Sequence, residues 1–150
     1  MKLEEAIQSS GFKNEKQKAV VNIMYTAYQV KSRISKVLKD YGLTPEQYNV
    51  LRILKGKYPE QMCVKDIAQR MIEHSSNVPR IIDRLESKKF VRRTQSGTDR
   101  RETVILLAQA GINILDTVNP QLDKWNNQIS EMTEEEIKQL NDLLDRYLKE

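Results

Sequence analysis

Arginine side chains are concentrated in residues 75–107, where they follow small polar residues and flank a glycine-containing turn. Arg80 and Arg84 lie four residues apart in an amphipathic segment, and Arg100 and Arg101 stand between two segments of alternating polarity. Arginine donates hydrogen bonds to phosphates and base edges, and a helix beside a basic hairpin can enter neighbouring grooves of a duplex. This order of residue types predicts that the stretch reads double-stranded DNA.

The charge distribution agrees with this prediction. Residues 88–101 hold six lysines and arginines against one acid, whereas residues 108–150 hold four basic and nine acidic residues. A basic segment of this kind is the electrostatic footprint of a phosphate-binding surface, and the acidic tail is expected to face elsewhere. A solvated charged surface is the alternative reading of the same charges.

Two helices are expected before this stretch. Gly42 ends the first of them, and Thr44, Pro45 and Gln47 form the capping box and first turn of the second, which Gly56 and Pro59 should break. The first helix is marked by apolar residues at alternating intervals of three and four: Val20, Ile23, Ala27, Val30, Ile34, Val37 and Tyr41.

The reading stretch itself is expected to be a helix-turn-helix followed by a hairpin. Helices are predicted at residues 64–71 and 76–88, with the turn at residues 73–75. Two strands, at residues 91–95 and 102–107, should be joined across residues 96–98.

Helical patterns return near the end of the chain. Ile112, Leu115, Val118, Leu122, Trp125 and Ile129 share one face, and Pro120 should bend that helix or begin a new turn. Thr133 and Glu136 form a further capping box, which begins a last helix carrying Ile137, Leu140, Leu144 and Tyr147. A middle domain cannot cover all these apolar stripes, so we expect a symmetric dimer with two reading helices about 34 Å apart.

Four segments carry a family resemblance. They are LTPEQYNVLRIL at residues 43–54, VKDIAQRM at residues 64–71, VPRIIDRLESKKFVRR at residues 78–93 and, in the wing, DRRETVILLAQAG at residues 99–111. They resemble the MarR (multiple antibiotic resistance regulator) family of winged-helix transcription factors. The resemblance implies a mainly α fold with a small β-hairpin wing, in a single domain over residues 1–150. The winged helix-turn-helix would span about residues 44–108, and the dimerisation helices about residues 1–41 and 109–150.

The resemblance also implies roles for particular residues. Arg101 matches the wing arginine that enters the minor groove, and Asp99 matches the acid that orients it. The start of the recognition helix would be Ser76, Asn77, Pro79 and Arg80. With neighbours chosen from the residue pattern, the expected DNA contacts are Ser75, Ser76, Asn77, Pro79, Arg80 and Arg84 in the recognition helix, and Arg93, Thr98, Asp99, Arg100 and Arg101 in the wing. Arg84 can meet either a phosphate or an internal carboxylate such as Asp83 or Glu86.

Three residues depart from the family pattern. Pro79 stands where the family often has threonine, and a proline is tolerated in the first turn of a helix. Lys89 replaces a usual glycine, which implies strain of about 1 kcal/mol if the backbone is left-handed there. Ala108 replaces a capping threonine, at a cost of about 1 kcal/mol to the start of the next helix.

No catalytic, cofactor or metal motif is found in the sequence. Nucleotide-binding glycine motifs, C-x-x-C and H-E-x-x-H are absent, and His74 has no second histidine beside it. Cys63 is the single cysteine and is expected to be a buried filler; a thiol-based redox sensor is the alternative. A small-molecule effector, which the resemblance allows, could bind a cavity lined by Met24, Tyr25, Tyr28, Tyr48 and Met71, although each of these also fits a core position.

Composition sets the remaining expectations. With 39% hydrophobic and 31% charged residues, the chain is expected to be a globular cytoplasmic protein without a membrane span. The expected function is a homodimeric, sequence-specific transcriptional regulator, a repressor of a pseudo-palindromic operator. A winged-helix protein-interaction module that does not read DNA is the alternative of a different class.

Overall fold

The computed structural model describes residues 1–148, which form helices and a small antiparallel sheet. The elements in chain order are α1 (Leu3–Ala6), α2 (Glu15–Lys39), α3 (Pro45–Lys57), β1 (Met62–Cys63), α4 (Val64–Arg70), α5 (Val78–Ser87), β2 (Val91–Gln95), β3 (Thr103–Leu107), α6 (Gln109–Asn126) and α7 (Glu134–Asp145). The expected fold class, mainly α with a winged helix-turn-helix, is confirmed.

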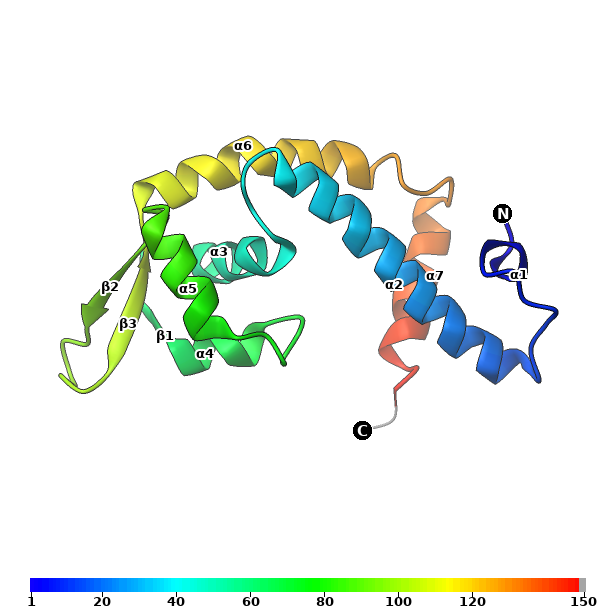
Figure 1. Ribbon diagram of the computed structural model, residues 1–150, viewed down its shortest axis with the longest axis horizontal. Coiled ribbons are helices and arrows are strands. Elements are labelled where there is room, and N and C mark those ends of the chain that lie inside the picture. Colours follow the sequence, from blue (N-terminus) through cyan, green and yellow to red (C-terminus); the bar gives the residue numbers. More distant parts are fainter. Residues whose placement is uncertain (149–150) are drawn as a thin grey trace.

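The elements separate into two ends (Figure 1). The helices α3, α4 and α5 and the three strands form a winged head at one end, with the β2–β3 hairpin outermost. The long helices α2 and α6 run from this head toward the other end, where α1 and α7 lie. The expected DNA-reading elements and the expected dimerisation helices are thus spatially distinct.

The sheet has the strand order β1-β3-β2. Val91 pairs with Leu107 at the base of the β2–β3 hairpin, and Gln95 pairs with Thr103 near its tip. The third strand, β1, was not expected from the sequence because its two residues, Met62 and Cys63, are too few to show alternation. The connecting loop is also longer than expected and spans residues 96–102, so the three charged residues predicted to follow the tip belong to the loop itself.

Burial of one stripe of α5 orients this helix. Val78, Ile82 and Leu85 recur at intervals of four and three residues and are almost completely buried. They pack into a core that joins all elements of the head to α2 and α6, and that includes Leu38, Val50, Leu51, Leu54, Ile67, Val91, Ile105, Leu115 and Val118.

The junction between α2 and α3 is built as expected. Gly42 has a φ of 69°, and the Leu43 N–H donates to the Leu38 carbonyl at 3.1 Å, which closes the C-terminus of α2. Thr44 and Gln47 form the predicted capping box, with the Thr44 hydroxyl accepting the Gln47 N–H at 3.1 Å. The predicted break at Gly56 is wrong, because Gly56 lies inside α3, where a glycine costs only about 1 kcal/mol relative to alanine.

The start of α5 lies two residues later than expected. Its N-cap is Asn77, whose side chain accepts the Arg80 N–H at 3.3 Å, so Ser75 and Ser76 belong to the preceding turn. Pro79 lies in the first helical turn, where its missing N–H leaves no intrahelical bond unmade.

Helix α6 differs from expectation at both ends. It begins at Gln109, and Ala108 is its N-cap with no side-chain hydrogen bond, as expected from the missing threonine. Pro120 lies inside α6 without interrupting it, and the helix ends at Asn126, so Ile129 does not belong to its apolar face. Gly111 is required by close packing, since a Cβ atom there would lie 2.3 Å from the Phe90 carbonyl oxygen.

The C-terminal helix α7 has an apolar face that the rest of the chain does not cover. Thr133 and Glu136 form its predicted capping box, yet α7 has no buried residue. Its exposed apolar residues, with those that follow it, are Ile137, Leu140, Leu143, Leu144, Tyr147 and Leu148. Residues 149 and 150 of the expected C-terminal dimerisation segment lie outside the described residues.

The end of α5 generates a stability prediction. Lys89 has a φ of 64°, so the backbone is left-handed at this C′ position, which is the condition under which strain was expected. We expect Lys89→Gly to raise the free energy of unfolding by about 1 kcal/mol, because glycine adopts this conformation without a Cβ clash. Urea denaturation at one fixed protein concentration measures the effect. Gly42→Ala, at the equivalent position after α2, is the matched control and should destabilise; a Lys89→Gly variant no more stable than the parent would contradict the assigned strain.

Candidate nucleic-acid interface

The exposed side of α5 carries the residues expected to read bases. Because Val78, Ile82 and Leu85 face the core, Arg80 and Arg84 are exposed to solvent. Asn77 has a divided role, since its side-chain oxygen caps α5 and its amide nitrogen is left as a donor.

The carboxylates near Arg84 are used by another arginine. Arg93 of β2 is ion-paired with Asp83 of α5, and its Nε lies 3.8 Å from Glu86 Oε2. The Arg93 backbone N–H also donates to Glu86 at 3.3 Å. Among the described residues no ion pair involves Arg84, so of its two predicted uses the internal carboxylate is not the one adopted. Arg93, rather than Arg84, pairs with these carboxylates and links β2 of the wing to α5.

The wing loop is organised by its own polar side chains. The Asp99 carboxylate accepts the backbone N–H of Arg101 at 2.9 Å, and the Glu102 N–H donates to the Asp99 carbonyl at 3.1 Å. Asp99 therefore shapes the turn that presents Arg101 rather than pairing with its guanidinium. Thr98 donates its N–H to the Ser96 hydroxyl at 3.3 Å, and Arg100 and Arg101 are exposed.

The basic run from residue 88 to residue 101 is only partly available to a ligand. Lys88 Nζ donates to the Gly42 carbonyl and, at 3.1 Å, to Oε1 of the buried Gln47, so this lysine ties the end of α5 to the α2–α3 junction. Because Arg93 is also ion-paired, four of the six basic residues remain exposed and available to a ligand: Lys89, Arg92, Arg100 and Arg101.

The loop before α5 is held by contacts that the sequence did not indicate. Asn49 of α3 accepts the Ile72 N–H at 2.9 Å. Lys31 of α2 is ion-paired with Glu73, and its Nζ lies 2.8 Å from Glu46 Oε1 of α3. The hydrogen bond from Lys31 lowers the pKa of Glu46, and the bonds to Glu46 and Glu73 raise the pKa of Lys31. Both shifts favour the charged forms of Lys31 and Glu46.

A cavity of about 590 Å³ lies between α2, α3, α6 and this loop. The hydroxyl of Tyr48 donates to Asn119 at 2.7 Å, and burial raises the pKa of Tyr48. The lining is Ala27, Val30, Lys31, Ile34, Pro45, Glu46, Tyr48, Asn49, Arg52, Met71, Ile72, Glu73, Leu122, Asp123 and Asn126.

Two of the five residues expected to line a ligand cavity do so. Tyr48 and Met71 belong to the lining, whereas Met24, Tyr25 and Tyr28 do not. Met24 and Tyr28 are 67% and 68% exposed and lie on the free side of α2. The apolar spacing of α2 could not separate these two sides, because one faces α3 and α6 whereas Met24 and Tyr28 on the other remain exposed among the described residues.

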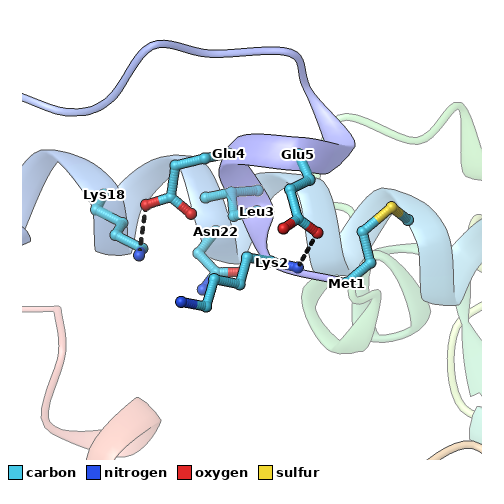
Figure 2. A pocket seen from close by; sticks show the side chains of 7 residues that line it. All are labelled: Met1, Lys2, Leu3, Glu4, Glu5, Lys18 and Asn22. Atoms are coloured by element: carbon cyan, nitrogen blue, oxygen red, sulfur yellow. Dashed lines mark hydrogen bonds and ion pairs between the residues drawn. The ribbon is translucent and has the colours of Figure 1, made fainter.

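A second hollow lies at the opposite end of the molecule, where α1 rests on α2 (Figure 2). Lys18 Nζ lies 2.6 Å from Glu4 Oε1, and this hydrogen bond lowers the pKa of Glu4. The Lys2 N–H donates to Glu5 at 3.2 Å. The Lys18–Glu4 pair joins α1 to α2, the Lys2–Glu5 bond caps α1 itself, and Leu3 is buried.

The environment of Cys63 does not favour a thiolate. The Asp66 backbone N–H lowers the pKa of the thiol, but burial and the side chains of Asp66 and Glu102 outweigh it, so the pKa of Cys63 is raised. A raised thiol pKa reduces reactivity toward oxidants at neutral pH. This gives no support to the redox-sensor alternative.

Residues 1–148 contain neither a candidate metal site nor a helix suited to span a membrane. No group of three or more histidine, cysteine, aspartate or glutamate side chains within them could hold a metal ion. Within the same residues, no helix has the length and apolarity needed to cross a bilayer.

The fold and the exposed arginines define a class of protein, the winged helix-turn-helix DNA-binding proteins. Residues 43–103 match the model of the MarR family. The chain is 29% identical over 136 residues to the HTH-type transcriptional regulator MhqR of Bacillus subtilis, a match that covers 88% of this chain and 91% of that one. It is also 29% identical over 117 residues to the HTH-type transcriptional regulator MgrA of Staphylococcus aureus, covering 76% of each chain.

Solved structures share the fold over most of its length. A MarR-like transcription regulator from Bacillus cereus superposes with a TM-score of 0.77 at 21% identity, over 87% of this chain and 93% of that one. The S. aureus MepR–DNA complex superposes with a TM-score of 0.75 at 23% identity, over 83% and 92% of the two chains. A MarR transcription factor from Planctomyces limnophilus is 28% identical, with a TM-score of 0.67 over 90% and 98%.

These findings support the resemblance to the MarR family that the sequence predicted. The curated relatives are HTH-type transcriptional regulators, which supports the expectation of a DNA-binding regulator. Its relatives are regulators rather than enzymes, which confirms the expectation that it is not an enzyme.

The ion pairs of Arg93 generate a prediction about the wing. We expect Arg93→Met to lower the free energy of unfolding by no more than about 1 kcal/mol, because the pair is partly exposed. The salt dependence of DNA binding should not change, since an arginine already paired with two carboxylates releases few counterions. Arg100→Met, which removes an unpaired loop arginine, is the control and should reduce the salt slope. If both variants flattened the slope equally, Arg93 would be a phosphate contact, as the sequence first suggested.

Proposed function

We propose that the protein is a homodimeric repressor that binds a pseudo-palindromic operator in the cytoplasm and is released from it by a small ligand. In each protomer α5 enters the major groove, and the wing loop enters the adjacent minor groove. The observation that carries the proposal is the joint exposure of unpaired arginines on α5 and on the loop, at one end of the molecule.

The reading residues have distinct roles in this proposal. Arg80, in the first turn of α5, reaches base edges, where a bidentate arginine–guanine pair is worth about 1–3 kcal/mol of discrimination. Arg84, one turn later, meets a phosphate. Ser75, Ser76 and Asn77 lie at the entry to the helix, where their short polar side chains can approach the groove.

In the wing, Arg101 inserts into the minor groove and Asp99 holds the turn behind it. Arg100 and Thr98 meet the adjacent backbone. Arginine in a narrow minor groove responds to groove width, so the wing would favour A·T-rich sequence. Pro79 gives this protein a base preference that differs from that of family members, because the family often has a threonine hydroxyl at this position.

Dimerisation is supported by apolar surface that the chain leaves uncovered. Val20, Met24 and Tyr28 of α2 are 47–68% exposed, and α7 has no buried residue despite its apolar stripe. A second copy that covers these helices would remove their exposed apolar residues from water. The acidic C-terminal segment then lies in the dimer frame, away from the phosphates.

Ligand release is supported by the cavity between the dimer helices and the head. Its volume of about 590 Å³ and its mixed lining of apolar, amide and charged groups suit a small organic molecule. An occupant there would press on Ile72 and Glu73, four to five residues before the N-cap of α5. Binding would therefore bias the position of the reading helix.

Selection of bound sequences from random duplex DNA at physiological salt tests the proposal. The expected result is a two-fold-symmetric motif with half-sites about one helical turn apart, bound by a protein that sediments as a dimer. A protein that retains no sequence preferentially would instead support an interaction module that does not read DNA.

Arg101→Ala should weaken binding to the selected sequence and reduce the slope of log affinity against log salt by about 0.9 or less. The reason is the loss of one guanidinium from the minor groove. Fluorescence anisotropy over a series of salt concentrations measures both quantities. Unchanged affinity and slope at matched ionic strength would remove Arg101 from the interface.

Arg80→Ala should relax base preference more than it weakens binding to random duplex, because a lost base-edge contact costs specificity before it costs phosphate attraction. Competition between selected and random duplexes measures the ratio. An equal loss on both duplexes would make Arg80 a phosphate contact instead.

A further inference from the structure

We infer that Lys31 is a positioning residue for DNA reading: it fixes the entry of α5 relative to the dimer frame and thereby sets which half-site spacing the protein accepts. The inference rests on the proposed function, because spacing has meaning only for a dimer on a two-part site. Neither the family match nor the sequence pattern assigns a role to Lys31.

The geometry is a three-way link between elements far apart in sequence. Lys31 projects from α2 and is ion-paired with Glu73 in the loop before α5. The same Nζ lies 2.8 Å from Glu46 in the first turn of α3. In Figure 1 the loop between α4 and α5 extends from the winged head toward α2. Lys31 thus joins the dimer frame to the loop that leads into the reading helix.

A second contact holds the loop that precedes α5. Asn49 of α3 accepts the N–H of Ile72 at 2.9 Å, so two consecutive loop residues are held from two different helices. Asn77, the N-cap of α5, follows Glu73 by four residues. Asn49 and Lys31 together therefore set the position of the N-terminus of α5, the helix that carries Arg80.

A direct phosphate contact by Lys31 is disfavoured by its surroundings. Its ammonium group is shared by the carboxylates of Glu46 and Glu73, so the cluster carries a net negative charge. A phosphate approaching this cluster would be repelled. The Lys31 side chain is 45% exposed, so its ion pairs contribute little to overall stability, and its effect should show in the geometry of DNA binding.

Half-site spacing is the property that such a link would control. Two reading helices on a rigid dimer match half-sites about 34–36 Å apart, and one inserted base pair moves and rotates one half-site relative to the other. A winged head held firmly to α2 binds DNA of altered half-site spacing weakly, whereas a head that can rotate relative to α2 still binds it. Loss of the Lys31 link should broaden spacing tolerance while leaving each reading helix intact.

The experiment uses the full-length protein and the sequence that it selects from random duplex DNA. Affinities are measured for that sequence, for versions with one base pair added or removed between the half-sites, and for random duplex. The variants are Lys31→Met, which removes the charge, Lys31→Arg, which keeps both ion pairs, and Glu73→Gln, which removes the loop partner. Lys36→Met is the matched control, because Lys36 lies on the same helix and takes part in no ion pair among the described residues.

We expect Lys31→Met and Glu73→Gln to reduce the preference for the selected spacing by about three- to tenfold. Lys31→Arg and Lys36→Met should keep the parental preference, and affinity for random duplex should stay the same in all variants. Glu73→Gln keeps the inference testable if Lys31→Met does not fold.

Two results would overturn the inference. The first is a parental spacing preference in both Lys31→Met and Glu73→Gln. The second is an equal loss of affinity on all duplexes with a smaller salt slope in Lys31→Met, which would make Lys31 a phosphate contact. If the parent protein selects no sequence, the proposed function fails and this inference fails with it, a result distinct from the other two.

Discussion

Burial of the apolar stripe of α5 is the interaction on which the DNA-reading surface depends. Val78, Ile82 and Leu85 are almost fully removed from water, and this fixes the rotation of the helix about its axis. With that rotation set, Arg80 and Arg84 must face solvent, because they lie on the opposite side of the same turns. The hydrophobic effect, which has no direction of its own, here determines where two guanidinium groups point.

Polar contacts between elements then set the position of the reading parts relative to one another. Arg93 spans from β2 to the carboxylates of α5 and so links the wing to the helix. Lys88 ties the end of that helix to the α2–α3 junction. Each contact is partly exposed and adds little to stability. Their common effect is geometric, because a protein that matches two grooves needs its parts at fixed separations.

The two ends of the molecule differ in how far their apolar residues are covered and in the sign of their charge. The head covers its apolar residues with its own helices and sheet, whereas α2 and α7 expose apolar faces that this chain leaves without a partner. Charge follows the same division, since the outward-facing lysines and arginines of residues 88–101 lie at the wing end and the excess of acidic over basic residues falls in residues 108–150. A surface for nucleic acid and a surface for a second copy are thereby kept apart.

The sequence by itself determined the features that arise from contacts close along the chain. Helix periodicity and the capping boxes at Thr44 and Thr133 follow from neighbours within a few residues, and the β2–β3 hairpin follows from two adjacent segments of alternating polarity. Tertiary structure alone decided which charges are available, because the partners of Arg93 and Lys31 lie 7 to 42 residues away. The short strand β1 and the lining of the cavity were likewise decided by packing, since two sides of one apolar helix look alike until a neighbouring element covers one of them.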